Sequence, residues 1–321
     1  MPKLREKIGA SLKLLDKGLM CYPFSLGGEM ILDDVDFGVI GGSGFYNIPN
    51  FKKTEEFFLK TPFGEPSDAL IIGEMKKKKV AFLARHGRHH NLLPTEINFK
   101  ANIYALKMIG VKAIISASAV GSLKEEIHPG DMVVPDQLFD RTRHRDDTFF
   151  GEGIVAHISF AKPFCHNLRE KLLKSLIKHS ISFHQNGTYL CMEGPQFSTR
   201  AESNLYKSWG MSIIGMTNLQ EAKLARECEI CYATLALVTD YDCWHPVEEE
   251  VKIENVLEIM RKNTENAQKV IADVIAEDHL DTCECHLALR NAIVTSRSHW
   301  PEKTYQKLKP LLLRWEKFNG K

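Results

Sequence analysis

The sequence predicts an α/β fold in which a mainly parallel or mixed sheet is covered by helices. From about residue 31 onward, apolar segments of strand length alternate with segments whose apolar residues recur at helical spacing. Glycine and small polar residues follow several of these strands, where ligands of open α/β sheets usually bind. No repeat or low-complexity linker divides the sequence. We therefore expect an N-terminal extension over residues 1–30 and one domain over 31–321 with a helical C-terminal tail.

The first half of the domain begins with an apolar strand that runs into a glycine turn. The pattern predicts that strand at 35–44, a hairpin at 68–87 with a solvated lysine turn, a helix at 95–108 and strands at 111–122 and 131–139. The segment "FDRTRHRDDTFFGEG" at 139–153 is charged, aromatic and aperiodic, which is typical of a mobile loop near a site or an interface.

The second half alternates helices and strands more regularly. Thr199 and Glu202 form the pattern of a capping box that opens a helix. A long amphipathic helix is predicted from Glu249 to about Ala276. The tail is expected to be helical with breaks at Pro301 and Pro310. The other predicted elements are a helix at 167–179, strands at 187–194, 211–217 and 231–240, and a helix at 218–228.

The composition favours a soluble globular protein with a large core. The 321 residues have a formal net charge of +1 and are 44% hydrophobic, so no overall charge attracts nucleic acid or an anionic membrane. The longest apolar runs have the length of a strand, far below a membrane span. The N-terminus has three basic residues but no apolar segment after them. We expect a cytoplasmic protein.

The eight cysteines do not form the dense pattern of a disulfide scaffold. Cys228-x-x-Cys231 and Cys283-x-Cys285, followed by His286, suggest a zinc site, but neither pair has the spacing of a partner half-site. Cys231 opens a buried strand, where a packed thiol is favoured over a ligand. For Cys283 and Cys285, a local disulfide and free thiols both remain open, and no metal site is predicted.

Several strand ends carry donors suited to an anion. Glycine turns expose backbone N–H groups, hydroxyls add donors, and an arginine offers a planar fork for a phosphate. Taken alone, the glycine turn is more often a plain turn, the small residues at a strand end are commonly packing, and the arginine fits a surface position as well as a phosphate site. The sequence has no dinucleotide fingerprint and no Walker A lysine. The candidate donors are Ser43 in "GGSG", Arg85 and His86 in "ARHG", Ser118 and Ala119 in "SASAVGS", and Thr217 in "GMTNLQEA".

Two carboxylates, Asp240 and Asp242, stand at the exit of an apolar strand in "TDYDCW". Such a pair can bind a metal, share a proton for acid chemistry, or accept hydrogen bonds from a ligand. No histidine set accompanies them, which disfavours a metal. Phe197, just before the capping box, fits either the core or a stacking position for a planar ring.

Taken in order, these motifs resemble the trimeric purine nucleoside phosphorylase family. The resemblance covers roughly residues 35–275 through "GVIGGSG", "TPFGEPSDAL", "LARHGRHH", "GSLKEEIHPGD", "EGPQFSTRAES", "GMTNLQEAKLARE" and "TDYDCW", and is best to the branch that acts on methylthioadenosine. It implies a phosphorylase/hydrolase-like fold with a mixed sheet forming a distorted barrel surrounded by helices. It also implies a trimer or a dimer of trimers, no cofactor, and phosphorolysis that releases adenine and 5-methylthioribose 1-phosphate.

The resemblance assigns roles to individual residues. Phosphate would contact the six donors named above, Met216 the sugar and Phe197 the base, while Asp240 and Asp242 would face N7 and the exocyclic amine. Some relatives have Asn where Gly215 stands, so that contact would be lost or replaced by water. Positions matched to specificity are Ser198, Ile253, Val256 and His157, the last lent by a neighbouring subunit to the 5' end of the pocket.

Three alternatives stay open on the sequence. The first is a purine nucleoside phosphorylase of broader specificity that takes adenosine, inosine, guanosine or methylthioinosine. A 6-oxopurine favours Asn over Asp at position 240, because an amide can both donate and accept. The second is hydrolysis by water, which leaves Arg85, His86 and Thr217 without a purpose. The third is a non-catalytic binding protein, which the retained carboxylates disfavour.

Overall fold

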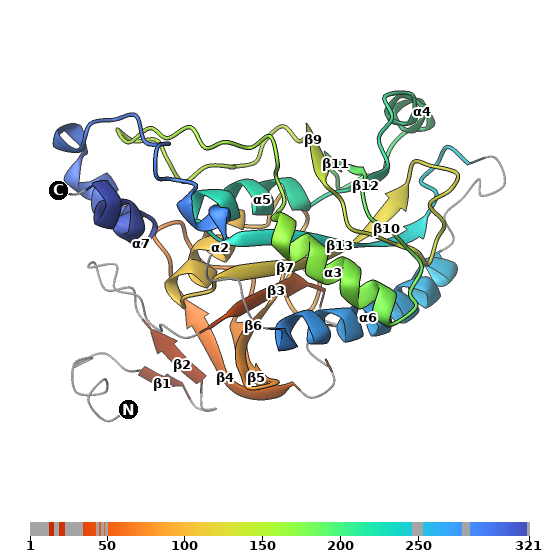
Figure 1. Ribbon diagram of the computed structural model, residues 1–321, viewed down its shortest axis with the longest axis horizontal. Helices are drawn as coiled ribbons and strands as arrows, with labels where there is room; N and C mark the ends of the chain where they lie inside the picture. The colour runs from red at the N-terminus through yellow and green to blue at the C-terminus, as the bar shows by residue number, and fades with distance from the viewer. Residues whose placement is uncertain are drawn as a thin grey trace.

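The computed structural model describes residues 13–15, 19–22, 35–42, 45, 48, 51–245, 253–277 and 283–319. Its strands form one mixed sheet with helices on both faces (Figure 1). The strands are β1 (Lys13–Leu15), β2 (Leu19–Tyr22), β3 (Phe37–Gly41), β4 (Lys52–Leu59), β5 (Leu70–Met75), β6 (Lys78–Ala84), β7 (Ala113–Ser122), β8 (Met132–Val133), β9 (Gln137–Arg141), β10 (Phe183–His184), β11 (Thr188–Met192), β12 (Ile213–Gly215) and β13 (Cys231–Asp240). The α-helices are α2 (Phe99–Met108), α3 (His166–Lys178), α4 (Arg200–Ser208), α5 (Asn218–Glu227), α6 (Ile253–Ala276) and α7 (Glu302–Asn319), and the 3-10 helices are η2 (Glu284–Leu287) and η3 (Arg297–His299).

The two faces of the sheet carry separate hydrophobic cores. Side chains alternate along β7, so that Ile114 packs toward α2, α5 and α7 while Ala113 and Ile115 pack toward α3 and α6. The same alternation places Tyr232 of β13 in the first core and Cys231 in the second. These two cores confirm the predicted α/β sheet covered by helices.

The long strand β7 organises the sheet. It pairs along its length with β13 on one side, and on the other side with β3 and then with β12. Strands β3, β6, β7 and β13 are parallel, so their carboxyl ends lie at one edge. The sheet order is β1-β2-β4-β5-β6-β3-β7-β12-β11-β9, with β13 joining β7 to β8 and β8 pairing with β10.

Several element boundaries differ from the prediction. Helix α2 begins at Phe99 rather than at 95, because the Asn98 side chain accepts a hydrogen bond from the Ala101 N–H. The strand predicted at 131–139 is two strands, β8 and β9, separated at Val134–Asp136. Pro310 does not end the tail helix but lies inside α7. Burial of Leu308 and its neighbours holds that helix together despite the missing proline N–H.

The N-terminal extension contributes to the sheet. Within residues 1–30, β1 pairs with β2, and β2 pairs in parallel with β4. The strand β4, which pairs with β2 and β5, has no counterpart in the prediction, since its first four residues are polar and exposed.

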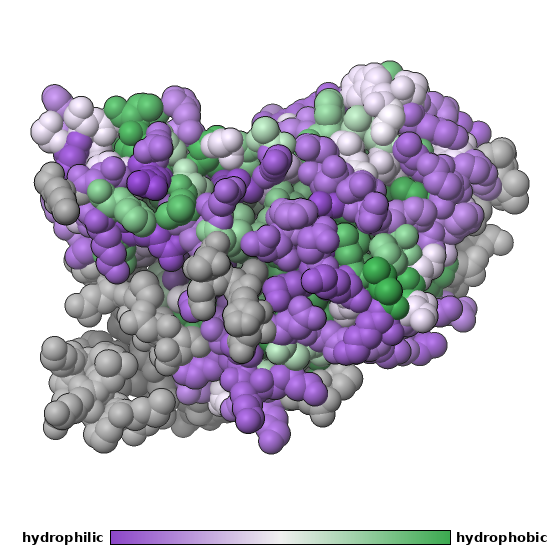
Figure 2. Space-filling view, viewed as in Figure 1, coloured by the Kyte–Doolittle hydropathy of each residue, from purple (hydrophilic) through white to green (hydrophobic). Residues whose placement is uncertain are grey.

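Most of the surface in one view is hydrophilic, interrupted by small apolar groups (Figure 2). Among the helices that the structure describes, none combines the length and the apolar character needed to cross a bilayer.

Candidate functional site

The candidate residues gather where the parallel strands end. Gly41 at the end of β3 pairs with Ala84, the residue before Arg85, and Asp240 at the end of β13 pairs with Gly121 of β7. The topology therefore brings the ends of β3, β6, β7 and β13 to one edge of the sheet, as the sequence predicted. Ser43 lies outside the described residues.

Arg85 is buried and forms an ion pair with Glu221 of α5. Its Nε lies 2.5 Å from Glu221 Oε1, and Nη2 donates to Glu221 Oε2 at 3.1 Å and to Ser116 Oγ at 2.6 Å. Nη1 donates to the Ala117 carbonyl oxygen at 3.0 Å. Four of the five guanidinium N–H groups are thus committed to protein acceptors, and one on Nη1 remains for a ligand.

His86 is a neutral imidazole in this structure. Burial lowers the pKa of His86 to about 4, and the neighbouring Arg85 charge acts in the same direction. Nδ1 lies 2.8 Å from the Leu92 carbonyl oxygen, which can only accept, so Nδ1 carries the proton. Nε2 is left as an acceptor. His86 therefore needs a second proton before it can donate to an anion.

Ser118 and Thr217 present hydroxyls from different elements. Asn218 Nδ2 lies 3.3 Å from Ser118 Oγ, while Thr234 donates to Asn218 Oδ1 and fixes the amide orientation. Thr217 is the N-cap residue of α5, but its side chain makes no capping hydrogen bond. Ala119 is exposed although both of its neighbours in β7 are buried. An opening in the structure therefore reaches the β7 backbone at this point.

Asp240 and Asp242 lie side by side against Gly121. A β-bulge between Val238 and Asp240 ends the regular pairing, and Asp240 Oδ1 accepts the Asp242 backbone N–H at 2.8 Å. A Cβ on Gly121 would approach Asp240 Oδ1 to 2.9 Å and Asp242 Cβ to 3.3 Å. Only glycine at position 121 lets both acids approach this strand so closely.

Both acids hold protons more tightly than free aspartate. Burial raises the pKa of Asp240, and the hydrogen bond from Thr239 at 2.7 Å opposes this only in part. Burial also raises the pKa of Asp242, and the neighbouring Asp240 charge adds to the increase. Asp242 Oδ2 is buried without a hydrogen-bond partner among the described residues. This pair can therefore supply a proton and an acceptor to a ligand.

Phe197 is 75% exposed, which excludes the core position that the sequence left open. The next residue, Ser198, is buried, and its carbonyl oxygen accepts from the Cys243 thiol at 3.2 Å. Met216 is half-buried, and its thioether occupies the space beside Gly194. These residues follow β11 and β12, which pair in parallel beside β7.

Arg145 anchors the segment that the sequence predicted to be a mobile loop. Its side chain is 2% exposed, its Nε lies 3.3 Å from Glu193 Oε1, and Nη1 donates to the Met216 carbonyl oxygen. Lys223 pairs with Asp140 at 3.2 Å in the same segment. The segment is thus fixed to the loops after β11 and β12.

The space beside Gly215 is filled by protein. A Cβ at position 215 would lie 1.9 Å from the Tyr189 hydroxyl oxygen. The Tyr189 side chain therefore occupies the volume that a longer residue at 215 would need, where the sequence suggested a lost contact or a water.

Of the remaining specificity candidates, the structure describes the side chain of His157 alone. His157 is exposed and lines a cavity of 880 Å³ with Cys165 and Cys283, whose thiols lie among the side chains of the α3 and α6 core. Ile253 opens α6 and Val256 lies in its first turn, but the side chains of both lie outside the described residues.

Sequence reasoning missed the groups that orient the candidates. Glu221, Asn218 and Arg145 contact Arg85, Ser118 and Met216 respectively. For Glu221 and Asn218, the sequence offered one signal of such a role. Both polar residues lie in the first turn of a helix that is predicted to pack on the sheet. Arg145 carried no such signal.

Comparison with known proteins defines the class. A model of the phosphorylase superfamily matches residues 36–276. The match includes every candidate at the sheet edge.

The individual relatives are more specific. S-methyl-5'-thioadenosine phosphorylase of Koribacter versatilis is 53% identical over 86% of this chain and 95% of its own length, and that of Synechocystis sp. is 56% identical over 86% of each. Among solved structures, a methylthioadenosine phosphorylase from an antarctic soil metagenomic library has a TM-score of 0.84 at 47% identity over 87% of this chain and 99% of that one. The enzyme of Schistosoma mansoni in complex with adenine has a TM-score of 0.75 at 38% identity over 79% and 97%. The chain belongs to the S-methyl-5'-thioadenosine phosphorylase family of the phosphorylase superfamily.

We predict that Glu221→Met lowers the free energy of unfolding by about 3 to 5 kcal/mol, because it leaves the buried Arg85 charge unpaired. Urea denaturation measures this loss. The control is Arg85→Met/Glu221→Met, which removes both charges and should be more stable than the single variant. A single variant as stable as the parent would contradict a structural role for the pair.

Proposed function

We propose that the protein cleaves S-methyl-5'-thioadenosine with inorganic phosphate, releasing adenine and 5-methylthioribose 1-phosphate. The observation that carries this proposal is the pair of acids with raised pKa values, half-buried Asp240 and buried Asp242, on the sheet edge that also carries hydroxyl groups, an arginine and a histidine. Family membership supports the same reaction. It also favours this substrate over the broader purine nucleosides of the alternative.

The reaction requires a site that stabilises opposite charges on the two halves of the nucleoside. As the glycosidic bond breaks, positive charge develops on the sugar and negative charge on the departing base. In the proposal, phosphate stabilises the first and attacks the anomeric carbon. Protonated Asp240 donates to N7 of the base, and Asp242 accepts a hydrogen bond from the exocyclic amine. Phosphate is a co-substrate, and the proposed mechanism needs neither cofactor nor metal at this site.

The binding assignments are proposals as well. Ser43, His86, Ser118, Ala119 and Thr217 would contact phosphate together with the one uncommitted N–H of Arg85. Met216 would contact the sugar, the exposed ring of Phe197 would stack on the base, and Ser198 would line the base pocket. Ile253 and Val256 would contact the methylthio group.

We propose in addition a homo-oligomer, a trimer or a dimer of trimers, in the cytoplasm, acting in purine and methionine salvage. The exposure of His157 fits a residue that completes the pocket of a neighbouring subunit.

A substrate panel tests the proposal directly. We expect methylthioadenosine to be consumed only when phosphate is present, with adenine and the sugar phosphate as products, and faster than adenosine, methylthioinosine or inosine. Separation of products by chromatography with and without phosphate measures this. Equal turnover without phosphate would establish hydrolysis instead, and preference for inosine would favour the broader enzyme.

Asp240→Asn should lower kcat for methylthioadenosine by ~10²- to 10⁴-fold, since an amide can hydrogen-bond to N7 but cannot protonate it. In the parent, kcat should fall as pH rises through the raised pKa of Asp240, because the acid then loses its proton. Asp273→Asn is the control, since Asp273 pairs with Lys178 on the surface of α6 and α3. Undiminished turnover by Asp240→Asn would rule out this assignment.

His86 makes phosphate binding dependent on pH. Because its Nε2 lacks a proton, the bound state must hold one proton more than the free protein and phosphate dianion. The KM for phosphate should therefore rise with pH above neutrality, by up to about tenfold per pH unit. His86→Gln offers an amide N–H₂ without proton uptake and should show a flatter profile in initial-rate measurements. Identical profiles would remove His86 from the phosphate site.

A further inference from the structure

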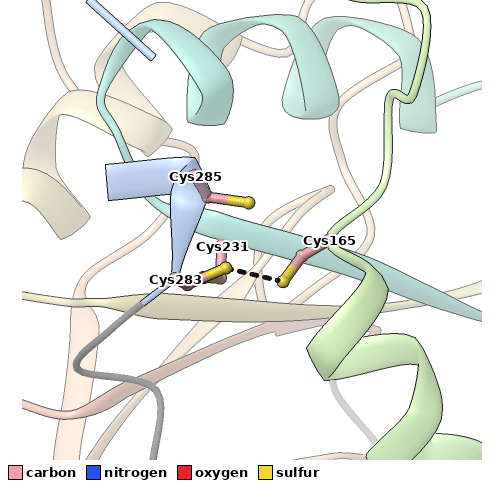
Figure 3. Close-up of side chains that lie close together, drawn as sticks. All are labelled: Cys165, Cys231, Cys283 and Cys285. Atoms are coloured by element: carbon pink, nitrogen blue, oxygen red, sulfur yellow. Dashed lines mark hydrogen bonds between the residues drawn. The ribbon is translucent and has the colours of Figure 1, made fainter. Parts of the chain in front are cut away.

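Four cysteines from three separate segments converge in the α3 and α6 core, away from the candidate site. Cys165 is the N-cap residue of α3, Cys231 opens β13, Cys283 is the N-cap residue of η2 and Cys285 lies within η2 (Figure 3). All four thiols lie within 4.8 Å of one another. Each residue is buried, with exposure between 0% and 8%.

The spacing of the thiols fits one metal ion. Four sulfur atoms arranged as a tetrahedron around zinc at about 2.3 Å are separated by about 3.8 Å. Cys165 Sγ and Cys283 Sγ lie 3.6 Å apart, too far for a disulfide bond, and all four are free cysteines. An iron–sulfur cluster would separate its ligands by the width of the cluster, which this spacing does not allow.

The surroundings suit thiolates. The N-terminus of α3 directs its positive dipole end toward Cys165. His286 Nδ1 lies 2.8 Å from the Glu229 carbonyl oxygen, so Nε2 faces Cys231 Sγ as an acceptor at 3.8 Å. The hydrogen bond to the backbone thus holds the His286 ring beside Cys231.

A route from solvent reaches the cluster. The cavity of 880 Å³ is lined by Cys165, Cys283 and Cys285, and also by Lys162, Arg226 and Arg290. The positive charges of these basic side chains partly neutralise the net negative charge of a divalent ion bound by four thiolates. An ion can thus enter without unfolding of the core.

We propose that Cys165, Cys231, Cys283 and Cys285 form a closed structural zinc site that ties α3 and the C-terminal tail to the start of β13. Four protein ligands leave no open position for a substrate, so the site stabilises the fold and takes no part in catalysis. This inference is independent of the proposed function. It differs from the expectation of no metal site, and Cys228, considered for such a site in the sequence, is not among the proposed ligands.

The metal content of the full-length protein tests the proposal. After purification under reducing conditions without chelator, we expect about one zinc ion per chain by mass spectrometry, and less than about a tenth of that for Cys283→Ser/Cys285→Ser. Cys228→Ser is the matched control: Cys228 is equally buried and lies three residues from Cys231 but outside the cluster, so it should retain the full amount.

Cobalt(II) added to the chelator-treated parent gives a second readout that does not depend on a variant. It should produce the thiolate charge-transfer and visible bands of a tetrahedral cobalt site, and circular dichroism establishes that the double variant is folded. A parent protein that binds neither ion with four reactive thiols, a parent that contains disulfides among these residues after anaerobic purification, or a cobalt spectrum that persists in the double variant would each overturn the proposal.

Discussion

The ion pair between Arg85 and Glu221 connects the parts of the structure that carry the candidate site. Arg85 follows β6, Glu221 belongs to α5, and both contact Ser116 of β7, while the Tyr232 hydroxyl of β13 donates to Glu221 at 2.8 Å. Removing two charges from water is costly, and the attraction is sufficient only when hydrogen bonds satisfy both groups. Here nearly every donor of Arg85 has an acceptor. The pair therefore fixes the relative position of three strands and one helix, and it thereby positions the neighbouring hydroxyl groups.

Most of the fold follows from local sequence patterns. Strands such as β7 and β13 are apolar runs bounded by small or polar residues, and the Thr199 capping box marks the start of α4 as predicted. The pattern fails where tertiary contacts decide. The strand β4 is mainly polar, and α7 continues through Pro310 because its neighbours are buried. Neither effect is visible in a short window of sequence.

The site was predictable to the extent that strand ends collect ligand-binding groups. The motif of Asp240 and Asp242 and the motif of Arg85 stand at ends of parallel strands, and the sheet order brings those ends together. The sequence did not indicate that most of the N–H donors of Arg85 bind acceptors within the protein. The role of Glu221 was not predicted, because the helix that contains it has an ordinary amphipathic pattern. The sequence drew attention to three of the four clustered cysteines, but Cys165 stands alone in sequence and becomes their neighbour only in the folded chain.

The close approach of Tyr189 to Gly215 links two positions on the paired strands β11 and β12. A relative with a residue larger than glycine at position 215 cannot keep the ring of Tyr189 where it lies in this structure. Positions 189 and 215 must therefore change in a fixed order during evolution or engineering. Tyr189 must be replaced by a smaller residue, or its ring displaced, before Gly215 is replaced. A substitution imported from a relative at position 215 alone would meet a steric barrier, although the same residue is tolerated in its original background.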